Sequence, residues 1–347
     1  MPRTLKGLLV LLSVAAAAAP AHARRGELHH YEATRLSMAC VYAIELYGPD
    51  AQNLPSVVND AFDEVDRIDR LMSHYKADSP LSRINREAGR HAVPVEPELF
   101  DFIADAMRYT RQSDGAFDIT VGRLMKAWGF FRGEGRMPSA GELADARRVV
   151  GAAHVLLDAQ AKTIRFDKPG VELDLGGIAK GYAVDRAAGV LRARGISSAL
   201  ISAGGSTIYA LGAPPGREGW DIAIQDPIDT RKEARTVQLK DRALSVAGSS
   251  EKAFEFEGVR YSHIMDPRSG RPVQGMLSVA VLASSGTQGD ALDDAFFVLG
   301  PTRSPKYSKQ WPGVEVLFFK ARAAISEPHG EGSQTGIWFH GRANRSM

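Results

Sequence analysis

Apolar residues recur along this chain with two different periods, and together they indicate a mixed α and β fold. Apolar residues three or four positions apart predict helices at 58–72, 99–107, 178–191 and 290–299. Alternating or short continuous apolar runs predict strands at 38–47, 155–158, 163–166, 171–175, 200–202, 220–224, 236–239, 243–246, 261–265, 277–282 and 314–319. Several strands follow one another without a helix between them, so we expect an α+β fold with largely antiparallel or mixed sheets flanked by helices. Residues 321–347 are expected to form an irregular tail.

The clearest chemistry lies where the strand expected at 171–175 leads into a helix. Gly176 and Gly177 allow a tight turn, with backbone conformations closed to other residues. Lys180 then falls in the first turn of the helix, where the helix dipole disfavours a cation. Free amide groups beside a lysine can bind a phosphate, although the glycine spacing fits neither the dinucleotide-binding motif nor the P-loop. From the spacing alone, an ordinary turn with a surface lysine is an equal alternative.

Two other groups could face the same anionic ligand. Asp290, Asp293 and Asp294 share one face of the last predicted helix, at its first turn. Three carboxylates there either complement the helix dipole or repel one another unless a cation lies among them, and oxygen ligands suit Mg²⁺ or Ca²⁺. His263 precedes a turn, and Gly204-Gly205 would let backbone approach a ligand closely. A structural role is the ordinary explanation of a lone histidine or a glycine turn.

Residues 1–23 are predicted to be a signal peptide. Arg3 and Lys6 precede an apolar run at 7–19 that is too short to span a bilayer comfortably, and Ala21-His22-Ala23 is typical of a signal-peptidase site. Cleavage would place the mature N-terminus at Arg24, which mass spectrometry of the exported protein measures. The mature chain would balance 41 basic against 41 acidic residues, which argues against a nucleic-acid partner. We expect a periplasmic protein without a membrane span.

The single cysteine, Cys40, excludes an internal disulfide and is expected to act as a small buried apolar residue. The length remaining after residue 23 suits one large domain or two closely joined domains with a substantial core.

Five motifs, in their order along the chain, resemble those of the ApbE family, the FAD:protein FMN transferases. They are 115–122 (GAFDITVG), 173–182 (LDLGGIAKGY), 202–205 (SAGG), 263–270 (HIMDPRSG) and 290–292 (DAL). The resemblance covers roughly residues 36–320. It implies that residues 24–347 form a single α+β domain of two closely joined lobes, with the flavin cleft between them.

The resemblance also implies an activity. Members of this family are Mg²⁺-dependent transferases that cleave the pyrophosphate of FAD, release AMP and attach FMN to a Ser or Thr hydroxyl of another protein. The expected acceptor is an exported or membrane electron-transfer protein, such as a respiratory subunit. An FAD pyrophosphatase, in which water replaces the hydroxyl, and a non-catalytic flavin-binding protein are the alternatives. Phosphoryl transfer needs positioning and charge neutralisation, which a lysine near carboxylates and a divalent cation can supply.

The resemblance assigns roles to individual residues. The expected FAD contacts are Met38, Tyr75, Ala116, Phe117, Asp118, Asp174, Lys180, His263 and Ile264. The expected metal ligands are the backbone oxygen of Gly177 and the side chains of Asp290, Asp293 and Asp294. The expected catalytic residues are His263, Lys180 and Asp290. The base that takes the hydroxyl proton is either His263 or an aspartate of the acidic group.

Two positions depart from the family pattern. Asp294 stands where the family usually has Thr, so the metal site here is expected to be more anionic. Ser206 stands where an acidic residue is usual after the glycine pair. The choice between Mg²⁺ and Ca²⁺ therefore stays open.

Overall fold

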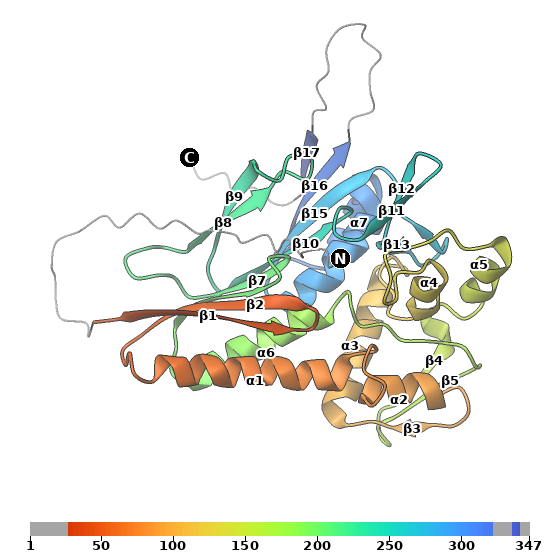
Figure 1. Ribbon diagram of the computed structural model, residues 1–347, viewed down its shortest axis with the longest axis horizontal. Coiled ribbons are helices and arrows are strands. Elements are labelled where there is room, and N and C mark those ends of the chain that lie inside the picture. Colours follow the sequence, from red (N-terminus) through yellow and green to blue (C-terminus); the bar gives the residue numbers. More distant parts are fainter. Residues whose placement is uncertain (1–26, 322–334, 341–347) are drawn as a thin grey trace, which may run out of the picture.

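The computed structural model describes residues 27–321 and 335–340, and Figure 1 shows a large sheet with helices packed against it. The helices are α1 (Leu54–Met72), α2 (Pro80–Glu87), α3 (Pro97–Gln112), α4 (Gly122–Ala127), α5 (Ala140–Arg147), α6 (Ala179–Ala193) and α7 (Gly286–Ser308), with a 3₁₀ turn at Ala152–His154. The strands are β1 (His29–Ser37), β2 (Cys40–Gly48), β3 (Val93–Pro94), β4 (Val155–Asp158), β5 (Thr163–Phe166), β6 (Ser198–Ala203), β7 (Thr207–Leu211), β8 (Trp220–Gln225), β9 (Glu233–Leu239), β10 (Arg242–Gly248), β11 (Ala253–Phe256), β12 (Val259–Ser262), β13 (Met265–Asp266), β14 (Arg271–Pro272), β15 (Met276–Ala283), β16 (Glu315–Ala321) and β17 (Thr335–His340).

An eight-stranded sheet forms the frame of the molecule. Its strand order is β1-β2-β6-β7-β10-β15-β16-β17, and every neighbouring pair is antiparallel. The register places Ser245 of β10 opposite Thr207 of β7. A smaller lobe, on the right in Figure 1, holds α2 to α5 and the three-stranded sheet β3-β5-β4. The predicted α+β class with antiparallel sheets is therefore confirmed.

The large sheet is apolar on both faces. On one face, the buried side chains of Ile44 and its neighbours meet those of α1, which include Phe62 and Ile68. Helices α6 and α7 pack on the same face. On the other face, Leu244 and Phe319 pack against Trp220 in the β8–β9 ribbon. Since both faces bury apolar area there, the central strand β15 (MLSVAVLA) reads as a nearly continuous apolar run.

Most helices begin where the sequence provides a start signal. Pro97 opens α3 at a position where the missing N–H costs nothing. Ser79 caps α2 by accepting a hydrogen bond from the amide of Ser82 at 3.0 Å, and Pro80 follows it. Helix α5 starts with a capping box formed by Ser139 and Glu142.

Helices α6 and α7 satisfy each other's free amide groups. No side chain of its own N-cap residue caps α6, but the amide of Gly181 donates to Asp290 Oδ2 of α7 at 2.6 Å. In return, Asp185 of α6 accepts from the amides of Gly286 and Thr287 at 2.6 and 2.8 Å. Two chain segments about a hundred residues apart are thus joined by reciprocal caps.

This crossing depends on two glycines. A Cβ at Gly181 would lie 2.1 Å from the carbonyl oxygen of Gly286, and a Cβ at Gly286 would lie 2.7 Å from that of Gly181. The two backbones are therefore in direct contact. Any larger residue would separate the helices and lengthen the capping hydrogen bonds.

Two predicted elements around the site are wrong in detail. Residues 171–175 form no strand beyond one isolated bridge between Val121 and Glu172, because the Asn85 side chain bonds the amide and carbonyl of Leu173 at 2.8 and 2.9 Å. The helix expected at 290–299 begins four residues earlier, because Ser285 caps it by accepting the amide of Gln288. That helix also continues through a kink at Gly300.

Other differences lie further from the site. The strand expected at 261–265 is divided into β12 and β13, with His263 and Ile264 between them. Strands β1 and β7 were not predicted, and β17 pairs with β16 where an irregular tail was expected. The turn between β1 and β2 places Met38 and Ala39 in the left-handed region, at φ 48° and 60°. The expected signal peptide lies outside the described residues, and within the described ranges no helix has the length and apolarity to cross a membrane.

The glycine contact predicts opposite effects for two alanine substitutions in α6. Gly181→Ala should lower the free energy of unfolding by about 1–3 kcal/mol, because the new methyl group meets backbone atoms that cannot rotate away. Gly189→Ala should raise it by about 0.5–1 kcal/mol, because nothing lies within 4 Å of that position and alanine favours a helix. Urea denaturation measures both. Equal effects of the two substitutions would contradict the close approach of α6 and α7.

Candidate functional site

A cavity of about 560 Å³ opens where α6, α7 and the large sheet meet the smaller lobe. Every site residue expected from the sequence lines this cavity: Met38, Tyr75, Ala116, Phe117, Asp118, Asp174, Gly177, Lys180, His263, Ile264, Asp290, Asp293 and Asp294. The fold therefore brings four of the five motifs to one cavity, and the fifth, at 202–205, ends directly before the lining residue Ser206. Their individual roles remain predictions.

The Gly176–Gly177 turn sits at the start of α6. Asp174 accepts the amide of Gly176 at 2.8 Å, which turns the chain into the helix. Gly177 lies against Asp294, since a Cβ on Gly177 would be only 2.4 Å from Asp294 Oδ2. Glycine is therefore required here for close approach to a carboxylate.

Asp290 is held by three hydrogen-bond donors from three different elements. Its Oδ2 accepts from the amide of Gly181 in α6. Its Oδ1 accepts from Thr207 Oγ1 of β7 at 2.5 Å and from Ser245 Oγ of β10 at 2.8 Å. Both oxygens of this buried carboxylate are thus hydrogen-bonded within the protein. Asp290 links α7 to the sheet and to α6.

Asp293 takes part in the same network. Its Oδ2 lies 2.7 Å from Ser245 Oγ, but a hydroxyl has only one proton and Ser245 cannot donate it to Asp290 and Asp293 at once. Burial, reinforced by Asp294 and Asp290, raises the pKa of Asp293 well above its usual value. A protonated Asp293 that donates to Ser245, which donates to Asp290, satisfies all three groups.

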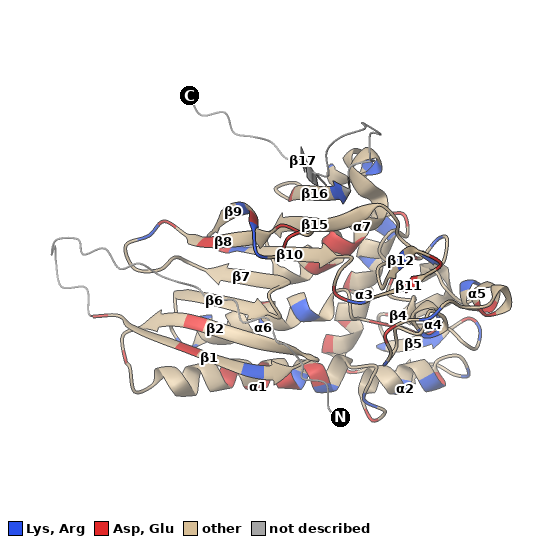
Figure 2. Cartoon of the chain, turned by 45° about the horizontal axis from the view of Figure 1, so that its top comes forward, with Lys and Arg blue, Asp and Glu red and all other residues tan. Residues whose placement is uncertain are grey.

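Asp294 is the member of the acidic group without a hydrogen-bond partner among the described residues. Burial raises its pKa to about 7, and the negative charge of Asp290 adds to the effect while Lys180 opposes it. The three aspartates begin at the fifth residue of α7, and the first turn holds no acidic residue. The helix dipole, which acts over the first turn, therefore does not explain the group. Figure 2 shows this acidic stretch of α7 near the centre of the molecule.

Lys180 supplies the positive charge of the cavity. Its Nζ donates to Ser206 Oγ at 2.6 Å. Burial works to lower the pKa of Lys180, but the charges of Asp290 and Glu251 outweigh it, so the pKa is raised and the amine stays protonated. Because Ser206 is neutral, it leaves the full lysine charge available to an anionic ligand.

The donors around Asp294 fit a hard divalent cation. Among the described residues, no three His, Cys, Asp or Glu side chains are arranged as a ready metal cage. Mg²⁺ does not require one, because it is usually held by one or two carboxylates together with water and substrate phosphate oxygens. Asp294, which no donor neutralises, and the neighbouring Gly177 are the open positions for such an ion. Asp290 and Asp293 are already hydrogen-bonded.

His263 faces the cavity from the segment between β12 and β13. Its backbone amide and its Nδ1 both contact the carbonyl of Lys252, at 2.9 and 3.3 Å. A carbonyl only accepts, so Nδ1 carries a proton. Burial lowers the pKa of His263, although Glu251 opposes the shift. The neutral ring therefore keeps Nε2 free to accept a proton.

The rings of His74 and Tyr75 line the cavity and Phe131 packs against both; of these three, the sequence analysis found only Tyr75. The ring of His74 lies 4.0 Å from that of Tyr75 and 5.2 Å from that of Phe131, and the last two stack at 5.0 Å. His74 Nδ1 also lies 3.2 Å from Asp174 Oδ1. Burial lowers the pKa of His74, and Asp174 opposes the shift. The position of His74 beside Tyr75 in the sequence was the available signal.

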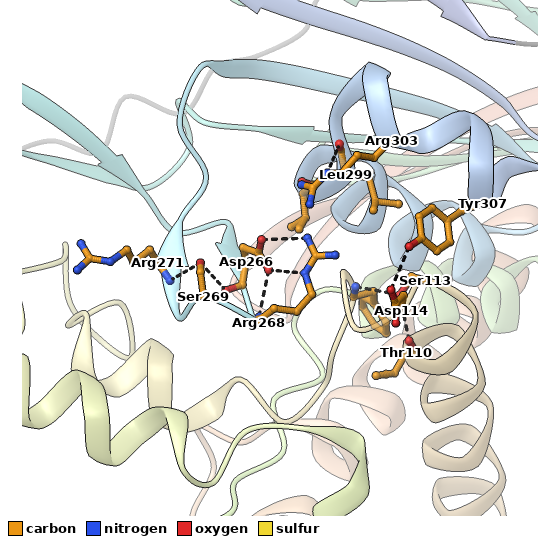
Figure 3. A network of polar contacts seen from close by, with 12 residues as sticks. Thr110, Ser113, Asp114, Asp266, Arg268, Ser269, Arg271, Leu299, Arg303 and Tyr307 are labelled. Atoms are coloured by element: carbon orange, nitrogen blue, oxygen red, sulfur yellow. Dashed lines mark hydrogen bonds and ion pairs between the residues drawn. The ribbon is translucent and has the colours of Figure 1, made fainter.

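The 115–118 loop forms one wall of the cavity and is supported from behind. Asp118 accepts from the amide and hydroxyl of Thr120 at 2.8 and 2.7 Å, and burial raises its pKa. Figure 3 shows Arg268 bonded to Asp266 through two contacts of 2.8 and 2.9 Å. The stem of Arg268 passes close to Gly115, whose Cβ would lie 3.7 Å from it. The turn after His263 therefore braces this loop.

Cys40 also lines the cavity, where it is partly buried. Burial raises the pKa of its thiol to about 11, while Lys180 opposes the shift. The thiol is therefore protonated at neutral pH and a weak nucleophile, in agreement with the expectation of a structural role.

Comparisons with known proteins give a consistent picture. The model of the ApbE family matches residues 38–318. The FAD:protein FMN transferase of Treponema pallidum is 32% identical over 311 residues, 85% of either chain, and that of Escherichia coli K12 is 31% identical over 274 residues, 77% of this chain and 78% of the relative. The flavin transferase ApbE from Vibrio cholerae superposes with a TM-score of 0.79 at 27% identity, over 90% of this chain and 97% of that one. The ApbE protein of Thermotoga maritima gives 0.77 at 32% identity, over 84% and 94%.

The raised pKa of Asp294 predicts a pH-dependent stability. Because the folded-state pKa is about 7 against an ordinary 3.8, the protonated form favours folding, and this contribution is lost as the pH rises from about 4 to about 7. Without metal, the wild type should lose thermal stability over this window more steeply than Asp294→Asn. Adding Mg²⁺ near pH 8 should raise the melting temperature of the wild type more than that of the variant. Equal stabilisation of both by Mg²⁺ would exclude Asp294 as the open metal position.

Proposed function

The chain belongs to the ApbE family and is a transferase, and from this premise we propose that it moves FMN from FAD to a Ser or Thr hydroxyl of an acceptor protein in a Mg²⁺-dependent reaction that releases AMP. The observation that supports this most is the meeting of four of the five family motifs in one cavity, which is lined by Lys180 and the α7 carboxylates as well as by the rings of His74 and Tyr75. Such a cavity has the size of a ligand site.

The aromatic and the charged residues of the cavity suit two different parts of FAD, its planar rings and its pyrophosphate. The rings of His74, Tyr75 and Phe131 offer an aromatic surface on which a flavin or adenine ring can stack. Lys180 offers a protonated amine to the pyrophosphate. FAD bound in this way would place its phosphorus atoms beside Lys180 in the first turn of α6.

The reaction needs little covalent help from the protein. In our proposal, His263 Nε2 takes the proton of the acceptor hydroxyl, the hydroxyl oxygen bonds to the FMN phosphorus, and the bond to the AMP phosphate breaks. Lys180 stabilises the charge that develops on the AMP phosphate. Mg²⁺, when bound beside Asp294 and Gly177, would neutralise pyrophosphate oxygens. We assign Asp290 a positioning role, because the protein engages both of its oxygens.

We also propose that the reaction takes place outside the cytoplasm. The expected signal peptide at 1–23 supports export to the periplasm. The acceptor would then be an exported or membrane electron-transfer protein.

A direct assay tests the proposed function. The purified protein is incubated with FAD and Mg²⁺, with and without a protein acceptor of the Escherichia coli relative, and AMP and protein-bound flavin fluorescence are measured. We expect AMP and a fluorescent acceptor band in equal amounts, and neither with EDTA. AMP release without any labelled acceptor would instead indicate an FAD pyrophosphatase, and intact bound FAD would indicate a flavin-binding protein.

Lys180→Ala should impair turnover far more than folding. Loss of one electrostatic stabiliser of the transition state typically costs about 2.7–4 kcal/mol of barrier, a factor of roughly 10²–10³ in rate. Ser206→Ala is the matched control, since it removes the hydrogen-bond partner of Lys180 and keeps the charge. Transfer rates and melting temperatures are measured for both. A Lys180→Ala enzyme of near-normal activity would disprove the phosphate assignment.

A further inference from the structure

We call the cavity that contains Lys180 and the α7 aspartates the flavin cavity. A second hollow lies directly beside it, on the other side of the 115–118 loop. Its volume is about 740 Å³, and it shares Asp118 and Pro267 with the flavin cavity. Helix α3, the end of α5 and the turn after β13 supply its walls. Figure 3 shows part of one wall, where Arg268 lies near Asp114. A molecule in this hollow would be separated from the flavin cavity by a single loop.

The hollow carries a net positive charge. Four arginines line it: Arg111, Arg147, Arg148 and Arg268. Arg148 pairs with Asp145 at 3.1 Å and Arg268 with Asp266. The exposed side chains of Arg111 and Arg147 have no ion pair or hydrogen bond with any residue in the described part of the chain.

Two carboxylates, those of Asp114 and Asp118, line the hollow, and neither forms an ion pair with Arg111 or Arg147. Asp114 accepts a hydrogen bond from the Tyr307 hydroxyl at 3.1 Å. Asp118 is buried, and burial raises its pKa. Two guanidinium groups therefore remain free to pair with carboxylates or phosphates from outside, which their planar donors bind in a bidentate manner.

We call this second cavity the arginine hollow. From its geometry we propose that it binds an acidic segment of the acceptor protein and so holds the acceptor hydroxyl at the adjoining flavin cavity. The proposal rests on the proposed function, which requires a polypeptide to approach that cavity. A volume of 740 Å³ far exceeds what a single small anion fills. Free arginines, separated by small apolar residues such as Ala144 and Val150, suit a peptide with several carboxylates.

A nucleotide fits this hollow less well. The rings that can stack on a base line the flavin cavity, whereas no aromatic residue lines the arginine hollow within the described residues. The protonated amine that suits a pyrophosphate, Lys180, also belongs to the flavin cavity. The division of rings and arginines between the two hollows therefore favours a protein segment.

A binding experiment tests the hollow independently of turnover. The probe is a fluorescein-labelled peptide of ten residues with one serine and five glutamates, and the control probe replaces each glutamate by lysine. We compare the wild type, the charge-reversed Arg111→Glu/Arg147→Glu, and Arg90→Glu/Arg165→Glu, which reverses two exposed arginines that line neither hollow. Fluorescence anisotropy should show that the wild type binds the acidic probe and that its affinity weakens with salt. The affinity should fall by about tenfold or more in Arg111→Glu/Arg147→Glu and change by less than about twofold in Arg90→Glu/Arg165→Glu.

Other outcomes overturn the proposal. Equal binding to both double variants, or binding of the lysine probe as strong as that of the glutamate probe, would exclude recognition by the hollow. Displacement of the acidic probe by equimolar inorganic phosphate or AMP would make it a small-anion site.

A second measurement separates this proposal from the proposed function. FAD binding without an acceptor, followed by flavin fluorescence, should be the same in the wild type and in Arg111→Glu/Arg147→Glu, while the KM for a protein acceptor should rise about tenfold with kcat unchanged. If no protein releases AMP when FAD, Mg²⁺ and an acceptor are all present, the proposed function is refuted and the peptide result still stands. An unchanged KM in this variant would refute the docking assignment alone.

Discussion

The site depends on one buried carboxylate, that of Asp290. It accepts hydrogen bonds from Gly181, Thr207 and Ser245, and thereby ties α7 to α6, β7 and β10. Leaving any of these donors unpaired in the interior would cost about 1–3 kcal/mol. The contact is possible only because two glycine backbones touch where α6 and α7 cross. Lys180 and Asp294 owe their positions to this arrangement, since Lys180 directly precedes Gly181 in α6 and Asp294 lies four residues after Asp290 in α7.

Acidic residues outnumber basic residues in the lining of the cavity. Lys180 is one cation among several buried carboxylates, and the raised pKa values of Asp293 and Asp294 express the resulting repulsion. A proton on Asp293 relieves part of it within the Ser245 network. The remaining charge at Asp294 is relieved by a proton at low pH or by a cation at high pH, so folding, protonation and metal binding are thermodynamically linked at this residue.

The sequence predicted the α+β class, most helices and strands, and the residues of the cavity, because ordered motifs and apolar periodicity are local signals. It failed where a distant side chain takes over a local role. Asn85 bonds the backbone of Leu173 and replaces the expected strand. The start of α7 was missed for a different reason, because the local cap by Ser285 precedes the apolar periodicity of the helix. The arginine hollow left no pattern at all, since Arg111, Arg147 and Arg268 lie on three separate elements that meet only in the folded chain. His74 was missed because its importance comes from the rings and the carboxylate around it.

The reciprocal caps of α6 and α7 also determine when the site can form. The amide of Gly181 donates to a carboxylate 109 positions further along the chain. Strands β7 and β10, whose hydroxyls complete the network, lie between these two residues in the sequence. Contacts of such long range form late, because the intervening chain must be ordered first. A chain that ends before α7 has the lysine and the glycine turn but no acidic group to hold them. The lysine, the glycine turn and the acidic group therefore come together only when the fold is complete.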